Sequence, residues 1–265
     1  MRQTLLFAPE SWMSAQVCES LPGISSALTE LRRTMDIAIF RWPCTAGGVP
    51  AGPSWREVAE AMADTIEAEA ANHGRPVTLL AMPDAAPLFI AAIPGHEASV
   101  AGFISASIHF SNGTLRALGM TAMVDFLNSA ARTSEAAEEP SGSHARRFLR
   151  FAMDEGSEED IEQAAAHVDA TIDWGCWDSF FQTYHEGFNL MALSPLPVVP
   201  TLYLDPPSKV YAGGEKVAVF TRLFPHAEVQ QLTDWPARLQ DANSGHELAG
   251  KVIAYLRRDA TRKRR

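Results

Sequence analysis

The sequence predicts an α/β protein with a doubly wound, mostly parallel β-sheet and a helical insertion. Three observations lead to this fold class. Short apolar segments with strand character alternate with amphipathic segments of helical spacing through residues 1–109. The segment TLLAM at 78–82 is almost continuously apolar, as a central parallel strand covered on both faces requires. Helical spacing alone fills 110–195 before the alternation resumes, which predicts an insertion.

Strands are expected where short runs rich in β-branched and aromatic residues are bounded by turn-forming residues. These runs are 3–9, 36–43, 76–82, 100–108, 198–207 and 227–232. Helices of the sheet domain are expected where apolar residues recur at helical spacing. These segments are 14–33, 54–74, 86–95, 213–225 and 246–258. The helix at 54–74 carries its own boundaries, since Ser54 with Glu57 forms a capping box and Gly74 is suited to end it.

The insertion contains its own helices and one polar loop. An amphipathic helix is expected over 114–131, a loop over 132–147, and further helices over 146–153 and 157–188. The predicted organisation is therefore a core formed by residues 1–109 and 196–256, a helical cap at 110–195 and a basic tail at 257–265.

Composition excludes several classes of protein. The net charge of −10 argues against a general nucleic-acid binder, and no apolar stretch reaches membrane-spanning length. Cys18, Cys44 and Cys176 are scattered and odd in number, so we expect neither a metal-binding motif nor a disulfide framework. A reducing cytoplasm fits such cysteine usage best. An oligomer is possible, because nothing in the sequence decides the oligomeric state.

Three segments carry a resemblance to a known family. They are PVTLLAMPDAAPLFIAAIPGHEASVAGFISAS at 76–107, LPVVPTLYLDPPSKV at 196–210 and FPHAEVQQLTDWPARLQDA at 224–242. Their order and character resemble the nucleophile strand and turn, the return to the sheet after a cap, and the last strand and histidine loop of the α/β-hydrolase superfamily. The resemblance covers residues 3 to about 256. It implies a site at the carboxyl ends of the strands, with FAPESW at 7–12 in the place of the oxyanion loop.

The chain departs from that family's pattern at each position of its Ser/Asp/His triad. The family's turn reads G-x-S-x-G, whereas here Pro83 stands at the serine. The position of the acid holds Asp205 or Lys209, and the histidine loop reads Asp-Trp-Pro around Trp235. We therefore expect a degenerate triad.

The proline constrains the turn after the third strand. The resemblance implies a positive φ at the nucleophile, which proline cannot adopt because its ring holds φ near about −65°. Either the turn is rebuilt, or it slides by one residue and Asp84 takes the left-handed apex. Some relatives, such as haloalkane dehalogenases and epoxide hydrolases, use an aspartate there as the nucleophile. Asp84 would then need a base, for which His109 and His246 are the candidates.

Each candidate also has an ordinary structural explanation. Asp84 can simply cap the following helix with its side chain, and Lys209 can belong to a turn. The aromatic residues of the insertion can form its core or an apolar roof over a ligand. The expected substrate-binding residues are Glu10, Ser11, Trp12, Pro83, Trp174, Trp177, Phe181, Asp205 and Trp235. No metal or other cofactor is expected, since neither ligand spacing nor a phosphate-binding glycine loop occurs.

Three functions are compatible with this pattern. The first is an enzyme that acts on a small, largely apolar organic molecule by acid/base chemistry such as cyclisation, elimination or isomerisation, with Asp84, His109 and Lys209 as proton-transfer groups. The second is a hydrolase with an Asp84 nucleophile and a displaced histidine base. The third is a catalytically inactive protein that binds a ligand or a partner on the same fold.

Overall fold

The computed structural model describes residues 2–49, 52, 54–125, 158–196, 199–207, 214–233 and 241–262. Its strands are β1 (Gln3–Ala8), β2 (Met35–Ile39), β3 (Val77–Ala81), β4 (Val100–Ala106), β5 (Thr201–Asp205) and β6 (Glu228–Gln231). Its helices are α1 (Ala15–Ser20), α2 (Pro22–Arg32), α3 (Trp55–His73), α4 (Ala85–Ala92), α5 (Asn112–Ala117), α8 (Glu158–Asp169), α9 (Trp174–Gly187), α10 (Glu215–Leu223) and α11 (Ala242–Arg262). Short 3-10 turns are η1 (Glu97–Ser99) and η2 (Leu190–Ala192).

The six strands form one parallel sheet in the order β2-β1-β3-β4-β5-β6. All six lie where the sequence predicts them, and the doubly wound parallel fold class is confirmed. The central strands β3 and β4 are almost wholly buried. Their apolar runs suit strands whose side chains are covered on both faces of the sheet.

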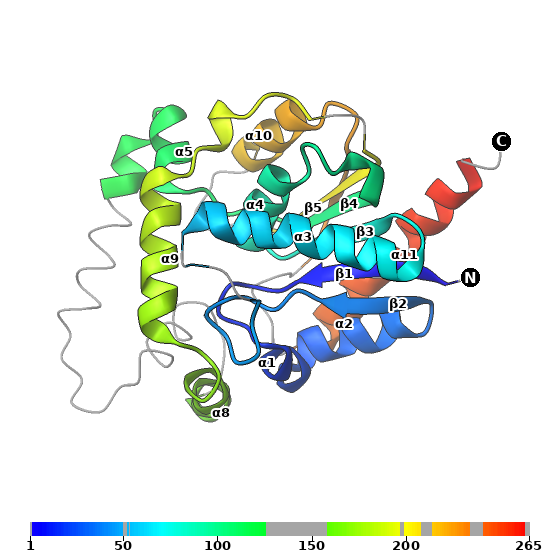
Figure 1. The fold of residues 1–265 in the computed structure, drawn as a ribbon, viewed down its shortest axis with the longest axis horizontal. Helices are drawn as coiled ribbons and strands as arrows, with labels where there is room; N and C mark the ends of the chain where they lie inside the picture. The colour runs from blue at the N-terminus through cyan, green and yellow to red at the C-terminus, as the bar shows by residue number, and fades with distance from the viewer. Residues whose placement is uncertain are drawn as a thin grey trace.

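The helices form a layer on each face of the sheet (Figure 1). The chain steps from β1 to β2 in one direction and then returns past β1 to β3. Because such crossovers are right-handed, this reversal puts α2 and α3 on opposite faces. α2 packs against the long C-terminal helix α11, and α3 packs against α4.

The local signals for α3 are confirmed. Ser54 and Glu57 form the reciprocal capping box, and Gly74 ends the helix in the left-handed conformation with φ 62°. Helix α11 starts earlier than expected and continues to Arg262, so the expected basic tail is helical over most of its length.

The described part of the segment between β4 and β5 is more broken than the sequence predicts. The helix expected over 114–131 ends at Ala117, because Gly119 with φ 76° turns the chain, and a further helical turn follows at 121–125. The helix expected over 157–188 is two helices, α8 and α9, since Asp173 caps α9 by accepting the Cys176 N–H at 3.1 Å. The loop expected over 132–147 and the helix expected over 146–153 lie outside the described residues. The domain boundaries remain a prediction.

Helix α9 lies across the carboxyl ends of the strands (Figure 1). Its start is joined to the loop after β2 by a disulfide between Cys44 and Cys176 and by the Asp173 N–H, which donates to the Cys44 carbonyl at 2.8 Å. The expectation of no disulfide is therefore wrong. The two cysteines are 132 residues apart, so no local spacing announces the bond. The bond also removes the observation on which the expectation of a reducing cytoplasm rested.

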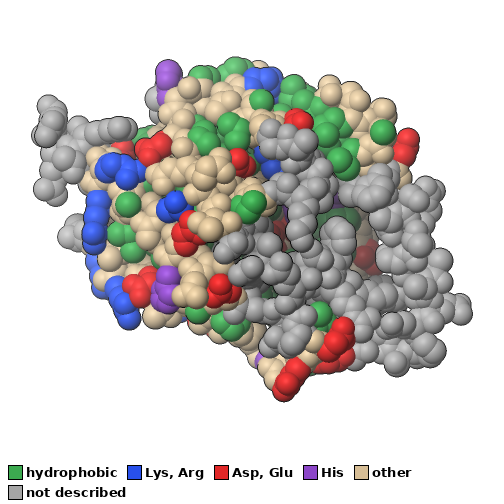
Figure 2. Space-filling view, turned by 180° about the vertical axis from the view of Figure 1, so that it is seen from behind, with side chains coloured by type: hydrophobic (Ala, Val, Ile, Leu, Met, Phe, Trp, Pro, Cys, Tyr) green, Lys and Arg blue, Asp and Glu red, His purple; other side chains and the backbone are tan. Residues whose placement is uncertain are grey.

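The face that carries α2 and α11 mixes charges of both signs (Figure 2). Arg32 pairs with Glu19, and Arg258 pairs with Glu228. Within the described part of the chain, no helix is both long and apolar enough to cross a membrane.

Candidate active site

The loops after β1 and β3 form the centre of the candidate site. The two strands are neighbours, and Ala8 pairs with Ala81, so they end level with each other. After β1 the chain moves to β2 on one side, whereas after β3 it moves to β4 on the other side. Ligands of open parallel sheets bind in the crevice that such a reversal leaves at the carboxyl ends. The topology brings Glu10, Ser11 and Asp84 to that crevice.

The turn after β3 is rebuilt. Asp84 has φ −71° and ψ −35°, which are ordinary helical values, so the alternative with Asp84 at a left-handed apex is wrong. Asp84 also makes no side-chain cap to α4. Its own N–H donates to Oε2 of Glu10 at 3.0 Å, so the buried Glu10 serves the start of the helix and leaves the Asp84 carboxylate available for other partners.

Two side chains hold the Asp84 carboxylate. Oδ1 lies 2.5 Å from Nδ1 of His109, and Oδ2 accepts a hydrogen bond from the Ser11 hydroxyl at 3.0 Å. The backbone N–H of His109 donates to the Pro83 carbonyl at 3.0 Å, which fixes the loop after β4 against the turn after β3. The Asp84 side chain is 13% exposed and that of His109 is 52% exposed. The pair therefore joins a largely buried carboxylate to an imidazole that reaches solvent.

The two carboxyl groups of the site have opposite electrostatic behaviour. Burial and the neighbouring Asp84 charge raise the pKa of Glu10 well above its usual range. Burial also acts to raise the pKa of Asp84, but the His109 charge and hydrogen bonds from His109, Glu10 and Ser11 outweigh it and lower the pKa to about 2. The two shifts are therefore opposite: the environment favours the protonated form of Glu10 and the ionised form of Asp84 beside His109.

Helix α9 covers the cluster with aromatic side chains. The Trp177 indole donates to the Ser11 hydroxyl at 3.1 Å, and the Tyr184 hydroxyl donates to the His109 carbonyl at 3.1 Å. Phe181 stacks on Trp177 with ring centroids 4.7 Å apart. Trp177 and Phe181, which the sequence marks as substrate-binding candidates, therefore lie at the site.

His185 is a site residue that the sequence analysis missed. Its ring packs against Phe181 at 4.1 Å between centroids. Burial lowers the pKa of His185 to about 4, while the charges of Asp84 and His109 act on it in opposite directions. His185 is therefore neutral near pH 7. Its place four residues after Phe181 on the same helical face was the available signal.

Lys216 is the second missed residue. The sequence points to Lys209, which lies outside the described residues, as does Trp235. Lys216, in the first turn of α10, donates from Nζ to the Ser107 hydroxyl at 3.3 Å. Burial lowers its pKa to about 8, against the opposing charges of Asp205 and Glu10. The lysine near this crevice among the described residues is thus Lys216.

The remaining predicted residues have other partners. His246 is in α11, with its imidazole 3.8 Å from Glu30 of α2, so its contact is with that helix and its role as a base stays a prediction. Asp205 accepts a hydrogen bond from Gln231 at 3.0 Å. Trp174 donates to Asp169 at 2.9 Å and packs edge-on against Trp177. Trp12 is buried in the hydrophobic core.

The cluster also contains possible metal ligands. Ligand atoms of Glu10, Asp84 and His109 all lie within 4.8 Å of one another. The sequence gives no sign of this grouping, because the three residues come from separate loops and form no spacing motif. An ion that took these ligands would have to displace the hydrogen bond between Asp84 and His109, so we treat the three as a hydrogen-bonded cluster.

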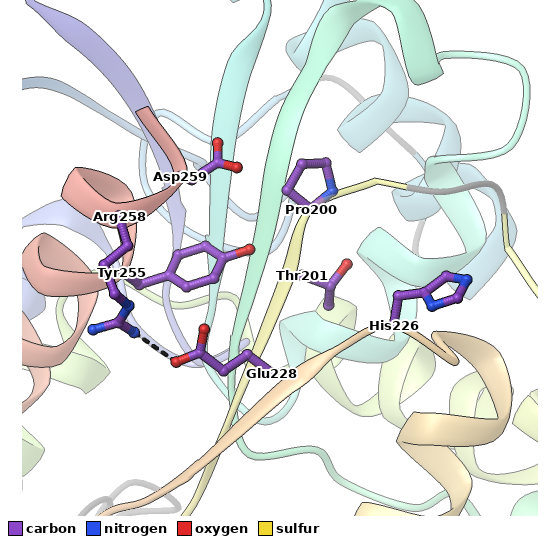
Figure 3. A pocket seen from close by; sticks show the side chains of 7 residues that line it. All are labelled: Pro200, Thr201, His226, Glu228, Tyr255, Arg258 and Asp259. Atoms are coloured by element: carbon purple, nitrogen blue, oxygen red, sulfur yellow. Dashed lines mark hydrogen bonds and ion pairs between the residues drawn. The ribbon is translucent and has the colours of Figure 1, made fainter. Parts of the chain in front are cut away.

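A shallow pocket lies at the opposite end of the sheet (Figure 3). Pro200 and Thr201 at the start of β5 and His226 and Glu228 at the start of β6 line it, with α11 on the other side. Figure 3 shows Arg258 paired with Glu228 at its rim. Because ligands of parallel sheets bind at the carboxyl ends of the strands, this pocket at the amino ends is not the candidate site.

Three solved structures show the fold to which this arrangement belongs. A hydrolase from Oleispira antarctica matches with a TM-score of 0.70 and 12% identity over 97% of this chain and 92% of its own. An epoxide hydrolase from Bacillus megaterium, solved with an inhibitor, matches with a TM-score of 0.69 and 12% identity over 97% and 94%. The bottromycin epimerase BotH, in complex with bottromycin A2, matches with a TM-score of 0.58 and 16% identity over 96% and 90%.

Sequence comparison gives no such match: neither a protein-family model nor a curated protein matches the chain. The structural matches extend over nearly the whole chain and agree with the resemblance seen in the three sequence segments. The protein therefore has the α/β-hydrolase fold.

Proposed function

We propose that the protein is an enzyme that moves protons on a small, largely apolar organic molecule, by isomerisation, elimination or cyclisation, without a serine triad. The observation that carries this proposal is the hydrogen bond between Asp84 Oδ1 and His109 Nδ1. A buried carboxylate that accepts the Nδ1 proton holds an imidazole in one tautomer and one orientation. Nε2, on the far side of the ring, is then the atom that takes up and returns a proton.

The proton cycle needs no other nucleophile. Nε2 of His109 removes a proton from the substrate, and the ionised Asp84 stabilises the imidazolium that forms. The same imidazolium returns the proton to another atom of the rearranged molecule. The reaction consumes no water, which separates it from hydrolysis.

Two further observations support this proposal. The aromatic side chains of α9 at the cluster, Trp177 and Phe181, suit an apolar substrate. One solved structure with the same fold is of an epimerase, so the fold also carries chemistry that is not hydrolysis.

The alternative with Asp84 as a hydrolytic nucleophile is less well supported. Nucleophilic attack requires a carboxylate oxygen free to reach the substrate, whereas both oxygens of Asp84 accept hydrogen bonds. Hydrolysis of an ester on Asp84 further requires a water between that residue and its base. At 2.5 Å from Asp84, His109 leaves no space for one. The third alternative is a catalytically inactive protein that binds a ligand or a partner. The following experiment separates all three alternatives.

The test uses proton exchange, because the natural substrate is unidentified. The protein is incubated in D₂O with a panel of small apolar ketones, lactones, esters and epoxides, and NMR follows deuterium uptake and product formation. We expect deuterium uptake at an acidic carbon of one panel class, reduced about 100-fold or more by His109→Gln and by Asp84→Ala. His96→Gln is the matched control, since His96 pairs with Glu67 at 2.8 Å near the surface, away from the site.

The outcomes are distinct. Cleavage with incorporation of solvent oxygen that Asp84→Asn abolishes, together with a covalent Asp84 adduct in intact-mass spectra, would support the hydrolase. Exchange that persists unchanged in His109→Gln would contradict the dyad. Binding of a panel member without exchange or turnover would support the inactive alternative.

A further inference from the structure

Ser107, directly after β4, has an unusual backbone conformation. Its φ is 75°, the one positive value of a non-glycine residue within the described ranges. This conformation is unfavourable for a residue with a Cβ and persists where the surroundings fix it. Here the Ser107 N–H donates to the Leu204 carbonyl at 2.9 Å, and its carbonyl accepts from the Ser105 hydroxyl at 2.5 Å. The strand ends thus hold Ser107 in a strained turn that directs its side chain.

The hydroxyl of Ser107 contacts a partly buried amine. Nζ of Lys216 lies 3.3 Å from Ser107 Oγ, within reach of a proton transfer between the two. Burial lowers the pKa of Lys216 to about 8, and the charges of Asp205 and Glu10 limit the fall. A fraction of the amine is therefore neutral just above pH 7 and can act as a base.

Tyr203 gives a second, independent indication. Its ring is fully buried, and among the described residues its hydroxyl has no hydrogen-bond partner of acceptable geometry. Burial raises its pKa, and the Ser107 hydroxyl opposes part of that rise, so the two hydroxyl groups are neighbours. A buried phenol with unused hydrogen-bonding capacity next to Ser107 is the kind of group that a bound ligand's oxygen would satisfy.

We propose that Ser107 and Lys216 form a second reactive centre, in which Ser107 is a nucleophile that takes an acyl group from a small ester, thioester or lactone. Lys216 Nζ, as the neutral amine, accepts the proton of the Ser107 hydroxyl while Oγ bonds to the carbonyl carbon. The bond from that carbon to the leaving oxygen or sulfur then breaks, and the ammonium returns the proton to the leaving group. Water releases the acyl group as a carboxylic acid, with Lys216 again as base.

This centre is separate from the Asp84–His109 pair. The two centres lie at the ends of neighbouring strands, and Glu10 lies near both, since it hydrogen-bonds to Asp84 and acts electrostatically on Lys216. Ser107 itself is 1% exposed, so the acyl donor must be small. The proposal does not depend on proton transfer at His109.

The test is acetylation by p-nitrophenyl acetate. The protein is mixed with the ester, release of p-nitrophenolate is followed, and the acetylated peptide is identified by mass spectrometry. We expect a burst of p-nitrophenolate and one acetyl group on Ser107. Ser107→Gly, which suits the left-handed backbone and removes the whole hydroxymethyl side chain, eliminates both. Lys216→Arg, which keeps the charge but cannot act as a base, slows the burst about 100-fold or more.

Lys251→Arg is the matched control, because Lys251 pairs with Glu247 on α11 and should leave the burst unchanged. Circular dichroism of each variant verifies folding. Acetylation of Lys216 itself with Ser107 unmodified would overturn the proposal, since an amine of lowered pKa can react directly. An unchanged burst in folded Ser107→Gly, or no acetyl group on Ser107 in the native protein, would overturn it as well.

Discussion

Asp84 and Ser107 follow neighbouring strands, but the local sequence predicts the backbone conformation only at the turn that contains Asp84. Pro83 beside Asp84 excludes a positive φ at position 83 by its ring alone, and the rebuilt turn follows from that. Nothing around Ser107 signals a left-handed residue, because no glycine or asparagine stands there. Its conformation comes from hydrogen bonds to Leu204 and Ser105 and from the contact with Lys216. A strained backbone conformation of this kind depends on the residues that contact it in space, and the local sequence does not predict it.

That strain can be measured by comparing two substitutions. Ser107→Gly and Ser107→Ala both remove the hydroxyl, but only alanine keeps the Cβ that disfavours φ 75°. We expect Ser107→Gly to be more stable than Ser107→Ala by about 1 kcal/mol in the free energy of unfolding, measured by urea denaturation. At Ser105, inside β4, the order should reverse, because glycine there has only its entropic cost. The same order at both positions would show that the Ser107 turn is not strained.

Helix α9 is the element that connects the sheet to the site. It brings Trp177 to Ser11, Tyr184 to His109 and His185 to the electrostatic field of Asp84. Its amphipathic spacing predicts a helix, but that spacing does not say what the aromatic face covers. The disulfide to Cys44 and the packing of Phe180 against Trp42 decide this by joining α9 to the loop after β2.

Reduction of the disulfide should therefore loosen this element. The bond closes a long loop in the unfolded chain, so its loss should lower the free energy of unfolding by about 5 kcal/mol. Urea denaturation with and without a reductant measures the difference. The double variant Cys44→Ser/Cys176→Ser is the control, because a reductant should leave it unchanged although Cys18 is still present as a free, buried thiol. Equal stability of the native protein under both conditions would contradict a structural role for the bond.

At the scale of the whole molecule, the site makes stability depend on pH. The folded-state pKa of His185 is about 4, below the usual 6.5, and that of Asp84 is about 2, below the usual 3.8. For both groups the unfolded chain binds protons more readily than the folded one. Their contributions are complete above those usual values and are lost as the pH falls through the folded-state values. Glu10 acts in the opposite sense, because its pKa is raised and its contribution is lost as the pH rises.

His185→Gln isolates one of these contributions. The stability difference between the native protein and His185→Gln should shrink as the pH falls from 6.5 to 4, by at most about 3 kcal/mol at 1.4 kcal/mol per pKa unit. Urea denaturation at steps of pH measures the difference. His96→Gln, a substitution of a histidine on the surface near Glu67, gives the reference for a histidine outside the site. A pH-independent difference for His185→Gln would show that the folded protein accommodates the charged ring.

Much of the fold could be predicted because it depends on local sequence patterns. The apolar run of β3, the capping box of α3 and the alternation of strand and helix each depend on residues close in the chain. The candidate site was predicted in part for the same reason, since Glu10, Ser11, Asp84 and His109 all follow predicted strands. Parallel strands bring their carboxyl ends to one edge, so residues at these positions become neighbours.

The sequence by itself determined the α/β class and the six strands. It also determined that a proline stands at the position of the usual serine and that a carboxylate, Asp84, follows it. Only the tertiary structure decided that His109 reaches Asp84, that Lys216 contacts Ser107, and that Cys44 bonds to Cys176. The physical reason is range. Backbone preference and hydrophobic periodicity act over a few residues, whereas hydrogen bonds and charges join groups by distance in space, wherever the chain has placed them.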